Sequence, residues 1–430
     1  MLRRIDIRGD SVDLDSALPT SVSSDAPAEV LQSVRSIISD VRERGDAALL
    51  EYTEKFDGIS LDSVAVLLDT AKEAWERTPQ DLKDALSFAA DRIRKYHEAQ
   101  ASNESSAAWG ADGISVAEIT RPVSRAGLYV PGGRGAYPST VLMTAIPAHV
   151  AGVQQIALCV PPDKDGLLPQ STLAAAALAE VDEIYSVGGA QAIAAMAYGT
   201  ESIKAVDVIV GPGNRYVSLA KREVAGDVGI DSMAGPSELV VIADDSTPPE
   251  FIALDLMAQA EHGPDGTAVV ISWNEDVLDA VNAALSRLVL NAPRRQDIES
   301  NFSTGGGSVL VRDWEQAVEV SNFIAPEHLE LAVTNADELL GAVTCAGAVF
   351  CGPWAPAVVG DYISGANHVL PTGRSARFAS ALRVDTFRKH IHVVRVERSG
   401  LENVAPFIAA LTEAEGLFAH GEAVARRVKK

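Results

Sequence analysis

The stretch GLYVPGGRGAYPSTVLMTAIPAHVAGVQQIALCV (127–160) decides the fold class. It contains two short apolar runs, GLYV (127–130) and QQIALCV (154–160), and the segment between them has the length of a helix. Both runs carry apolar residues on consecutive positions, so each predicts a strand that is buried on both faces. Strand, helix and strand in this order are typical of a parallel βαβ unit.

The same alternation extends from about residue 115 to about residue 355, where further apolar runs are separated by segments of helix length. These runs are EIYSV (183–187), AVDVIV (205–210), ELVVIA (238–243), TAVVIS (267–272), SVLVR (308–312) and GAVFCG (347–352). We therefore predict the α/β class, with two domains of related build and parallel sheets. A 3.6-residue apolar period over about the first 110 residues predicts an N-terminal helical part, and a strand followed by helices predicts a C-terminal tail.

The composition excludes several classes of partner. Lys and Arg total 36 against 59 Asp and Glu, a formal net charge of −23. An acidic chain without a basic stripe repels phosphate backbones, so we expect no nucleic-acid partner. The three cysteines form no CxxC pair, and Cys159 and Cys351 lie in apolar runs typical of buried strands. No apolar run reaches the ~18 residues of a membrane span and no secretory signal is present, so we expect a cytoplasmic protein that binds no membrane.

The first candidate metal ligands lie in LDLMAQAEHGP (254–264). Gln259 and His262 are three residues apart at the end of a predicted helix, which Gly263 terminates, so both leave its last turn on one face. An imidazole and an amide oxygen in this arrangement can share a metal ion. A histidine near a helix end is also often purely structural, so this motif alone leaves both interpretations open.

A broken loop, GPWAPAVVGDYISGANHVLPTG (352–373), and the C-terminal segment TEAEGLFAHGEAV (412–424) supply the other candidates. The loop is too rich in glycine and proline to be the interior of a helix or strand, and its Asp361 is a carboxylate of the kind that metal ions take. Asp361 alone could make an Asx-turn, and His420 of the C-terminal segment could be solvated. Together, however, Gln, His, Asp and His form a mixed N/O ligand set that suits zinc, with cobalt or manganese as substitutes.

Glu327 and His328, in APEHLELAV (325–333), are the candidate general bases. They open an apolar strand pattern, at a loop-to-strand junction of the kind where βα architectures carry catalytic groups. Successive side chains of a strand point in opposite directions, so we expect the two to do different jobs; a surface Glu-His pair is the alternative. Glycine turns near 132, 188 and 211 each follow a strand and open a helix, where free backbone N–H groups can hold a phosphate or carboxylate. None of them is the G-x-G-x-x-G fingerprint.

Together these segments resemble the histidinol dehydrogenase family, nearly from end to end. The matching strings stand in that family's order and spacing: LYVPGG (128–133), VGGAQAI (187–193), GPGN (211–214), AGPSE (234–238), QAEHGP (259–264), PEHLE (326–330), GDYxxGxNHVLPT (360–372) and AEGLxAHGEAV (414–424). One loop departs from the pattern. Where the family usually has ARxSSGLSV, this chain has ARFASALRVDTF (376–387), and we expect the shape of that loop to differ.

The resemblance implies two successive NAD-dependent oxidations, from L-histidinol to L-histidinaldehyde and then to L-histidine, in a homodimer with one zinc ion per subunit. The residues that it assigns are the zinc ligands Gln259, His262, Asp361 and His420; the catalytic bases Glu327 and His328; the substrate contacts Ser237, His368 and Glu415, besides the ligands and His328; and, along the NAD path, Tyr129, Gln191 and Asn214. His328 would take the hydroxyl proton as hydride leaves, and Glu327 would activate the water that attacks the aldehyde.

The resemblance also implies a domain division, with two incomplete Rossmann-like domains. The division is an N-terminal arm (1–24), a first Rossmann-like domain with the metal and catalytic residues (25–129 and 241–381), an inserted second one on the NAD side (130–240), and a C-terminal tail (382–430). The tail would bring Glu415 and His420 to the partner's site, so each active site would need the dimer.

Three alternatives to this function share some of the motifs. A related zinc- and NAD-dependent dehydrogenase of another small polar diol, such as a sulfonated one, would gain nothing from Glu415, whose charge matches a cationic substrate. A zinc hydrolase would not need the glycine turns. A catalytically silent paralogue would be expected to lack a ligand or a base, and none is missing.

Overall fold

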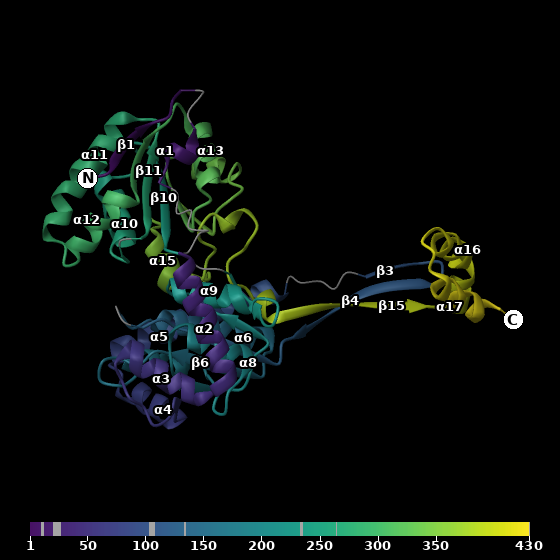
Figure 1. The fold of residues 1–430 in the computed structure, drawn as a ribbon. Coiled ribbons are helices and arrows are strands. Elements are labelled where there is room, and N and C mark those ends of the chain that lie inside the picture. Colours follow the sequence, from purple (N-terminus) through teal and green to yellow (C-terminus); the bar gives the residue numbers. More distant parts are fainter. Residues whose placement is uncertain are drawn as a thin grey trace.

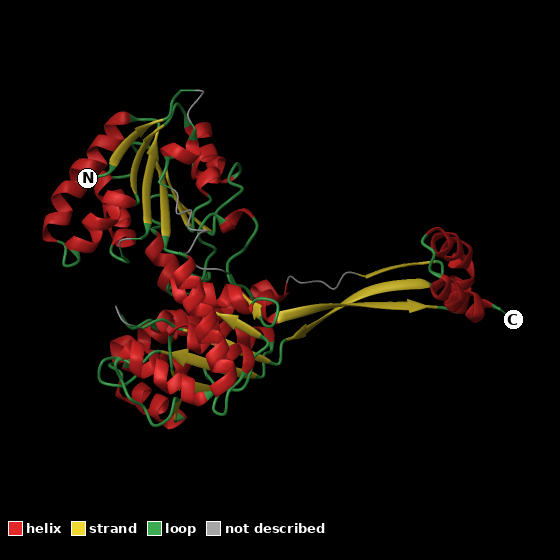
Figure 2. Cartoon of the chain, viewed as in Figure 1, coloured by secondary structure: helices red, strands yellow, loops and turns green. Residues whose placement is uncertain are grey.

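The protein consists of two α/β lobes and a long arm, as its computed structural model shows (Figure 1). The structure describes residues 1–9, 13–19, 27–102, 108–132, 135–232, 235–263 and 265–429. In Figure 2 the red helices of each lobe cover a yellow sheet, and two long strands lead away to a separate pair of helices at the C-terminus. The predicted α/β class with parallel sheets is confirmed.

The first lobe is built on a sheet whose described strands run in the order β1-β12-β11-β10-β13-β14, each parallel to its neighbour. The strands are β1 (Arg3–Asp6), β10 (Glu238–Ala243), β11 (Thr267–Ser272), β12 (Gly306–Leu310), β13 (His328–Ala332) and β14 (Ala348–Cys351). One face is covered by α10 (Pro249–Ala260), α11 (Glu275–Leu288) and α12 (Arg295–Thr304), with the 3₁₀ turn η1 (Val289–Asn291). The other face is covered by α1 (Leu14–Ala17), α13 (Trp314–Ile324) and α14 (Ala336–Leu340), while α15 (Ala357–Tyr362) packs against α10.

The second lobe has a sheet in the order β2-β7-β6-β5-β8-β9, in which β2 is antiparallel to β7 and the other described pairs are parallel. Its strands are β2 (Ala65–Val66), β5 (Arg125–Tyr129), β6 (Gln155–Val160), β7 (Glu183–Ser186), β8 (Val208–Val210) and β9 (Gly229–Ile230). One face carries α4 (Leu68–Arg77), α5 (Gln80–Ser102), α6 (Pro138–Ala151) and α7 (Gln170–Leu178). The opposite face carries α2 (Ala28–Arg44), α3 (Asp46–Asp57), α8 (Gly189–Tyr198) and α9 (Arg215–Val224).

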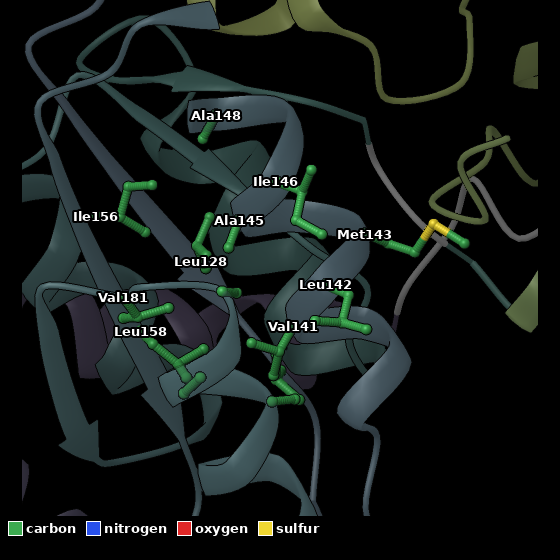
Figure 3. Close-up of a cluster of buried hydrophobic side chains, with 14 of the residues drawn as sticks. Leu128, Val141, Leu142, Met143, Ala145, Ile146, Ala148, Ile156, Leu158 and Val181 are labelled. Carbon is green, nitrogen blue, oxygen red and sulfur yellow. The ribbon is translucent and has the colours of Figure 1, made fainter. Parts of the chain in front are cut away.

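Helix α6 shows why the opening stretch forms a βαβ unit. It begins with Pro138 in its first turn, where the missing N–H costs nothing, and ends at Gly152, whose φ of 94° is favoured only by glycine. Between these signals nearly every side chain is buried, because the helix lies between the sheet and neighbouring helices. Figure 3 shows Leu142 and Ile146 of α6 packed in the same cluster as Leu128 and Leu158 of the strands.

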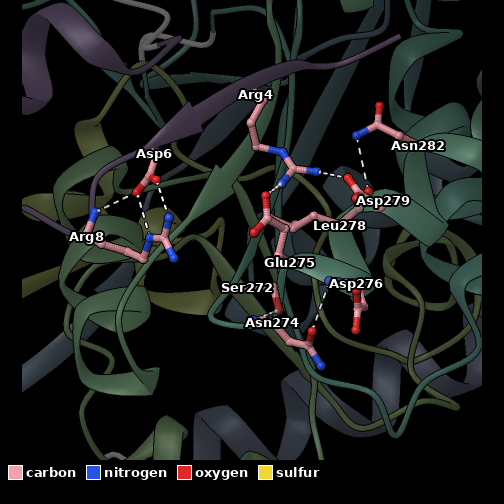
Figure 4. A network of polar contacts seen from close by, with 10 residues as sticks. All are labelled: Arg4, Asp6, Arg8, Ser272, Asn274, Glu275, Asp276, Leu278, Asp279 and Asn282. Atoms are coloured by element: carbon pink, nitrogen blue, oxygen red, sulfur yellow. Dashed lines mark hydrogen bonds and ion pairs between the residues drawn. The ribbon is translucent and has the colours of Figure 1, made fainter.

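The N-terminal strand is fastened to the first lobe by polar contacts as well as by its pairing with β12. Arg4 forms ion pairs with Glu275 and Asp279, both on α11 (Figure 4). The backbone N–H of Leu2 donates to Asn282 of the same helix, 3.0 Å away. Of the expected N-terminal arm, residues 10–12 and 20–24 lie outside the described residues.

The arm consists of an antiparallel sheet and two terminal helices. Its elements are β3 (Ala108–Ala111), β4 (Ile114–Pro122), β15 (Arg388–Val396), α16 (Arg398–Ala414) and α17 (Phe418–Val428). The two helices pack against each other at the far end of β4 and β15, well away from both lobes (Figure 1). The loop that departs from the family pattern forms the root of the arm, through the 3₁₀ turns η2 (Ser375–Arg377) and η3 (Val384–Phe387), where Val384 and Phe387 are fully buried.

The strand pairing groups the chain differently from the expected domain division. Strands β2 and β5, which fall within 25–129, pair in the second sheet and not with the strands of 241–381. The expected grouping of 25–129 with 241–381 is therefore wrong as far as these sheets are concerned. The physical reason is that β5 and β6 are joined by one helix, and a crossover of that length brings two parallel strands into one sheet.

Within the described residues, none of the helices has both the length and the apolar character needed to cross a lipid bilayer.

Candidate active site

Glu327 and His328 lie where β13 begins, at the amino edge of the first sheet. The pair thus occupies the loop-to-strand junction that the sequence predicted. Open parallel sheets usually bind ligands at the carboxyl edge, whereas this pair lies at the opposite edge. The explanation lies in the second lobe, whose helix α6 reaches the same place: its Thr140 lies 3.3 Å from His368 of the first lobe's loop. The site is thus formed where the two lobes meet.

The imidazole of His328 has a fixed orientation. Its Nδ1 lies 3.1 Å from the backbone carbonyl oxygen of Glu238. A carbonyl only accepts, so Nδ1 must donate to it, and Nε2 is the nitrogen that can take up or release a proton. Nε2 lies 3.6 Å from Oδ1 of Asp361, too far for a hydrogen bond, and it has no hydrogen-bond partner among the described residues. The ring therefore presents its titratable nitrogen, without a hydrogen-bond partner among the described residues, to the site.

Burial and two carboxylates govern the protonation of this pair. Glu327 and His328 are only 7% and 6% exposed, and Oε2 of Glu327 lies 3.6 Å from Nδ1 of His328. Burial lowers the pKa of His328, but the charges of Glu327 and Asp361 outweigh it and raise that pKa to about 9. Burial also raises the pKa of Glu327, against the opposing charge of His328. The backbone N–H of Glu238 donates to Glu327 at 3.0 Å, which fixes this carboxyl as well.

Asp361 and His368 come together from the broken loop (352–373). Nδ1 of His368 donates to the backbone carbonyl of Asp361 at 2.9 Å, and its Nε2 faces Oγ1 of Thr140. Burial alone would raise the pKa of Asp361, but its contact with His328 and the charges of His368 and His262 lower it instead. Asp361 is therefore held as a carboxylate among three imidazoles, which suits a cation ligand.

Gln259 and His262 leave the end of α10, as their spacing predicts. Gln259 is 7% exposed, and its amide nitrogen has no hydrogen-bond partner among the described residues. The unpaired atom is a donor, whereas the oxygen of the same amide is the atom that could coordinate a metal ion. His262 is exposed and close enough to Asp361 to affect its pKa. The three residues are compatible with a zinc site.

His420 and Glu415 do not join this site within one chain. Both are exposed, in or beside α17 at the far end of the arm (Figure 1). Accordingly, no three His, Cys, Asp or Glu side chains of the described residues lie close enough together to hold a metal ion. The predicted ligand set is thus split between the first lobe and the arm.

The residues expected along the NAD path lie at the carboxyl edge of the second sheet. Tyr129 ends β5, is 3% exposed, and accepts a hydrogen bond from the N–H of Gly189 at 3.2 Å; its burial raises its pKa to about 12. Gln191, in the first turn of α8, is 1% exposed, and its carbonyl oxygen has no hydrogen-bond partner among the described residues. Asn214 caps α9 by accepting from the N–H groups of Tyr216 and Val217. Asn214 thus stabilises the start of α9, and its side chain is exposed.

Four further residues belong to this neighbourhood and were not predicted. Glu238 orients His328 through its backbone, and Thr140 contacts His368 from the other lobe. Asp255 and Glu330 form a carboxyl pair behind the site. Asp255 and Glu330 could have been noticed in the sequence, because each is an acidic residue inside an apolar run. No such signal marked the roles of Glu238 and Thr140.

A family model described as histidinol dehydrogenase matches residues 21–428. The chain belongs to the histidinol dehydrogenase family. It is 48% identical over 400 residues to histidinol dehydrogenase of Parasynechococcus marenigrum (strain WH8102), covering 93% of this chain and 91% of that relative. It is 45% identical over 425 residues to that of Heliobacterium mobile, covering 98% of each. The crystal structure of histidinol dehydrogenase from Elizabethkingia anophelis matches with a TM-score of 0.94 and 36% identity, over 99% of this chain and 98% of that one.

Membership of the histidinol dehydrogenase family confirms the predicted resemblance and the predicted class of enzyme, an NAD-dependent dehydrogenase. The site at the lobe junction is therefore the candidate location of the family's chemistry. The arrangement there offers an oriented imidazole base, a second buried carboxyl, and oxygen and nitrogen ligands for a cation.

Proposed function

We propose that this chain oxidises L-histidinol to L-histidine through L-histidinaldehyde, as a zinc-dependent, cytoplasmic homodimer that reduces two NAD per turnover. The observation that carries the proposal most directly is the geometry of His328, whose proton is held on Nδ1 by Glu238 while Nε2 remains unpaired in the site. An alcohol oxidation needs a neutral, oriented nitrogen that can take the hydroxyl proton.

Gln259, His262 and Asp361 of one chain and His420 of the partner subunit would hold the zinc ion. When bound, zinc would orient the substrate through its amine and imidazole, and its charge would offset that of Asp361, which favours the neutral form of His328. Ser237, His368 and Glu415 would contact the substrate, with Glu415 supplying a charge matched to the cationic amine.

The two candidate bases would act in different half-reactions. His328 takes the hydroxyl proton of the alcohol at Nε2 while hydride passes to NAD. Glu327, whose carboxyl is held by the N–H of Glu238, takes a proton from the water that adds to the aldehyde, and the hydrate then gives up the second hydride. Burial of both side chains keeps bulk water from competing with these transfers.

NAD would bind along the carboxyl edge of the second sheet, near Tyr129, Gln191 and Asn214. Close packing of the backbone requires a glycine at this edge. At Gly211, φ is +118° and an added Cβ would lie 2.1 Å from the carbonyl oxygen of Tyr129, so no side chain fits there. The unpaired carbonyl oxygen of Gln191 is a candidate partner for a cofactor hydroxyl or amide.

The dimer proposal rests on two exposed apolar surfaces. On the arm, Phe407, Leu411 and Phe418 are 70%, 63% and 80% exposed. On the first lobe, Trp354 is 83% exposed and Tyr362 is 57% exposed, beside the helices that carry the candidate ligands. Large apolar side chains left in water in this number are typical of an interface. A second copy of the chain would cover both surfaces and would bring His420 and Glu415 to the ligands that one chain lacks.

The test is the stoichiometry of reduction. Zinc-loaded protein is dialysed and supplied with NAD and L-histidinol, and absorbance at the NADH band is compared with histidinol consumed. The proposal predicts two NADH per histidinol and L-histidine as product. One NADH with accumulating aldehyde, or turnover only on another diol, would contradict it; hydrolysis of an ester or amide without NADH would support a zinc hydrolase instead.

A further inference from the structure

Two carboxyl groups lie hydrogen-bonded to each other in the first lobe, outside the set of ligands and bases. Glu330 is 4% exposed on β13, and Asp255 is half-buried on α10. Their side chains share a hydrogen bond. Two carboxylates cannot make this bond, because one of them must supply a proton. Burial and the charge of Asp255 raise the pKa of Glu330 to about 8, so a shared proton is favoured at neutral pH.

The pair also holds a third element. Oε1 of Glu330 accepts the backbone N–H of Ala357, the first residue of α15, at 2.6 Å. Asp255, Glu330 and Ala357 therefore join α10, β13 and α15 at one point. These three elements carry Gln259, His328 and Asp361, respectively.

The spacing along each element relates this junction to the site. Asp255 precedes Gln259 by four residues on α10, and Ala357 precedes Asp361 by four residues on α15, so each is one helical turn away on the same face. Glu330 follows His328 by two residues on β13 and so shares its face of the sheet. Each of the three residues of this junction thus lies next to one functional side chain on the same helix or strand.

Apolar packing would be the ordinary way to join a helix to this face. Val241 of β10 and Leu256 of α10 belong to the same buried cluster. Burying carboxyls there costs free energy unless they are fully paired, whereas hydrogen bonds fix direction more strictly than apolar contacts do. The carboxyl pair at this point is therefore better explained by a requirement to fix the relative positions of α10, β13 and α15 than by a contribution to the stability of the core.

We propose that Asp255 and Glu330 are positioning residues of the metal site, whose shared hydrogen bond, together with the N–H of Ala357, sets the separation of Gln259, His328 and Asp361. This inference rests on the proposed zinc site. Neither residue contacts the reacting atoms, and removing the pair would leave every proposed ligand in the chain but with its element free to shift.

The experiment compares conservative and disruptive variants of the same two positions. Glu330→Gln and Asp255→Asn keep a hydrogen bond, because an amide N–H₂ can donate to the remaining carboxylate while its oxygen accepts. Glu330→Leu and Asp255→Leu abolish it. Val241→Ala, a buried change on the neighbouring strand, is the control for general loss of stability. Asp255→Leu changes a half-buried helix position and so provides a folded variant if Glu330→Leu is poorly stable.

Zinc affinity of each purified protein is measured by competition with a chromogenic chelator, alongside thermal stability, kcat and the KM for NAD. We expect the Leu variants to bind zinc at least ~10-fold more weakly and to lose kcat. The KM for NAD should not change, because the proposed NAD site lies in the other lobe. The amide variants should stay within about threefold of the parent protein, as should Val241→Ala.

Two results would overturn the inference while leaving the proposed function intact: Leu variants that bind zinc like the parent, or Val241→Ala losing zinc as strongly as Glu330→Leu at equal loss of stability. If the parent protein itself binds no zinc, the metal part of the proposed function fails, and the inference fails with it.

Discussion

Nδ1 of His328 lies 3.1 Å from the backbone carbonyl oxygen of Glu238, and this one contact determines which nitrogen of the ring can act as a base. Because a carbonyl can only accept, Nδ1 keeps its proton, and Nε2 is the nitrogen that can exchange a proton with the site. Glu327 is fixed from the other side by the N–H of the same residue, at 3.0 Å. The backbone of Glu238 thus orients both proposed bases at once.

Substitution of the two proposed bases should slow different half-reactions. His328→Asn should slow oxidation of histidinol, because Nε2 is lost, while Glu327→Gln should slow oxidation of supplied histidinaldehyde more than that of histidinol. Removal of one general base typically costs about 10²- to 10⁴-fold. Single-turnover assays with each substrate measure the two effects. Equal loss of both half-reactions in both variants would mean that the division of labour is wrong.

Removal of the metal should abolish activity, and zinc, manganese or cobalt should restore it. His262→Asn should lower metal affinity with little effect on the fold, because His262 is exposed at the end of α10. Metal content is followed by elemental analysis and folding by circular dichroism. Full turnover by protein shown to be metal-free would contradict the proposed ligand set.

Thr140→Val should raise the KM for histidinol severalfold. The hydroxyl of Thr140 faces Nε2 of His368 at 3.3 Å across the lobe junction, so its loss releases the proposed substrate contact. Thr144→Val is the matched control, because among the described residues that hydroxyl donates to helix carbonyls one turn earlier, at 2.7 and 3.2 Å. If both variants change the KM alike, the effect comes from α6 and not from His368.

Glu183→Gln should destabilise the protein most near neutral pH. Glu183 pairs with the buried Arg125 at 2.9 Å, and that hydrogen bond holds the pKa of Glu183 below its ordinary value of 4.5. A lowered folded-state pKa contributes stability above the ordinary pKa, which is lost as pH falls through the folded value. We expect a difference in unfolding free energy of about 1–3 kcal/mol at pH 7.

Urea unfolding of both proteins between pH 7 and pH 4 measures this difference. It should shrink as the pH falls below 4.5. Glu180→Gln, an exposed position of the same lobe, serves as the control. A difference that stays constant or widens toward acid would show that the ion pair is not its source.

The sequence predicted what depends on pattern and missed what depends on backbone. Alternating apolar runs predicted the α/β class, which is confirmed. The broken loop indicated Asp361 and His368 as candidate site residues; the two lie together, and their roles stay predictions. The role of Glu238 could not be predicted, because every residue has the carbonyl that it uses. The role of Thr140 could not be predicted either, because this residue reaches the site only where the two lobes meet.

Asp255 and Glu330 show where a sequence signal existed but was ambiguous. Each is an acidic residue within an apolar segment, FIALDLMAQA and HLELAV, respectively. Such a residue predicts a buried, paired carboxyl. Its partner, however, lies 75 residues away along the chain, and only the packing of α10 on β13 identifies it. The arm was predicted as a tail, whereas its projection away from both lobes follows from the long pairing of β4 with β15.

The central claim is that each active site combines the first lobe of one subunit with the arm of the other. A chain with His262→Asn keeps an intact arm, and a chain with His420→Asn keeps an intact Gln259, His262 and Asp361. Each variant alone should be inactive, since both of its sites lack a ligand. In a hybrid dimer, however, one of the two sites is complete.

The decisive measurement is therefore the activity of an equimolar mixture of these two variants after subunit exchange, which is verified by native mass spectrometry. Statistical exchange makes about half of the dimers hybrids, so the account predicts recovery of roughly a quarter of the parent activity. If all four ligands came from one chain, no dimer in the mixture could contain a complete site. Zero recovery despite demonstrated exchange would contradict the shared active site.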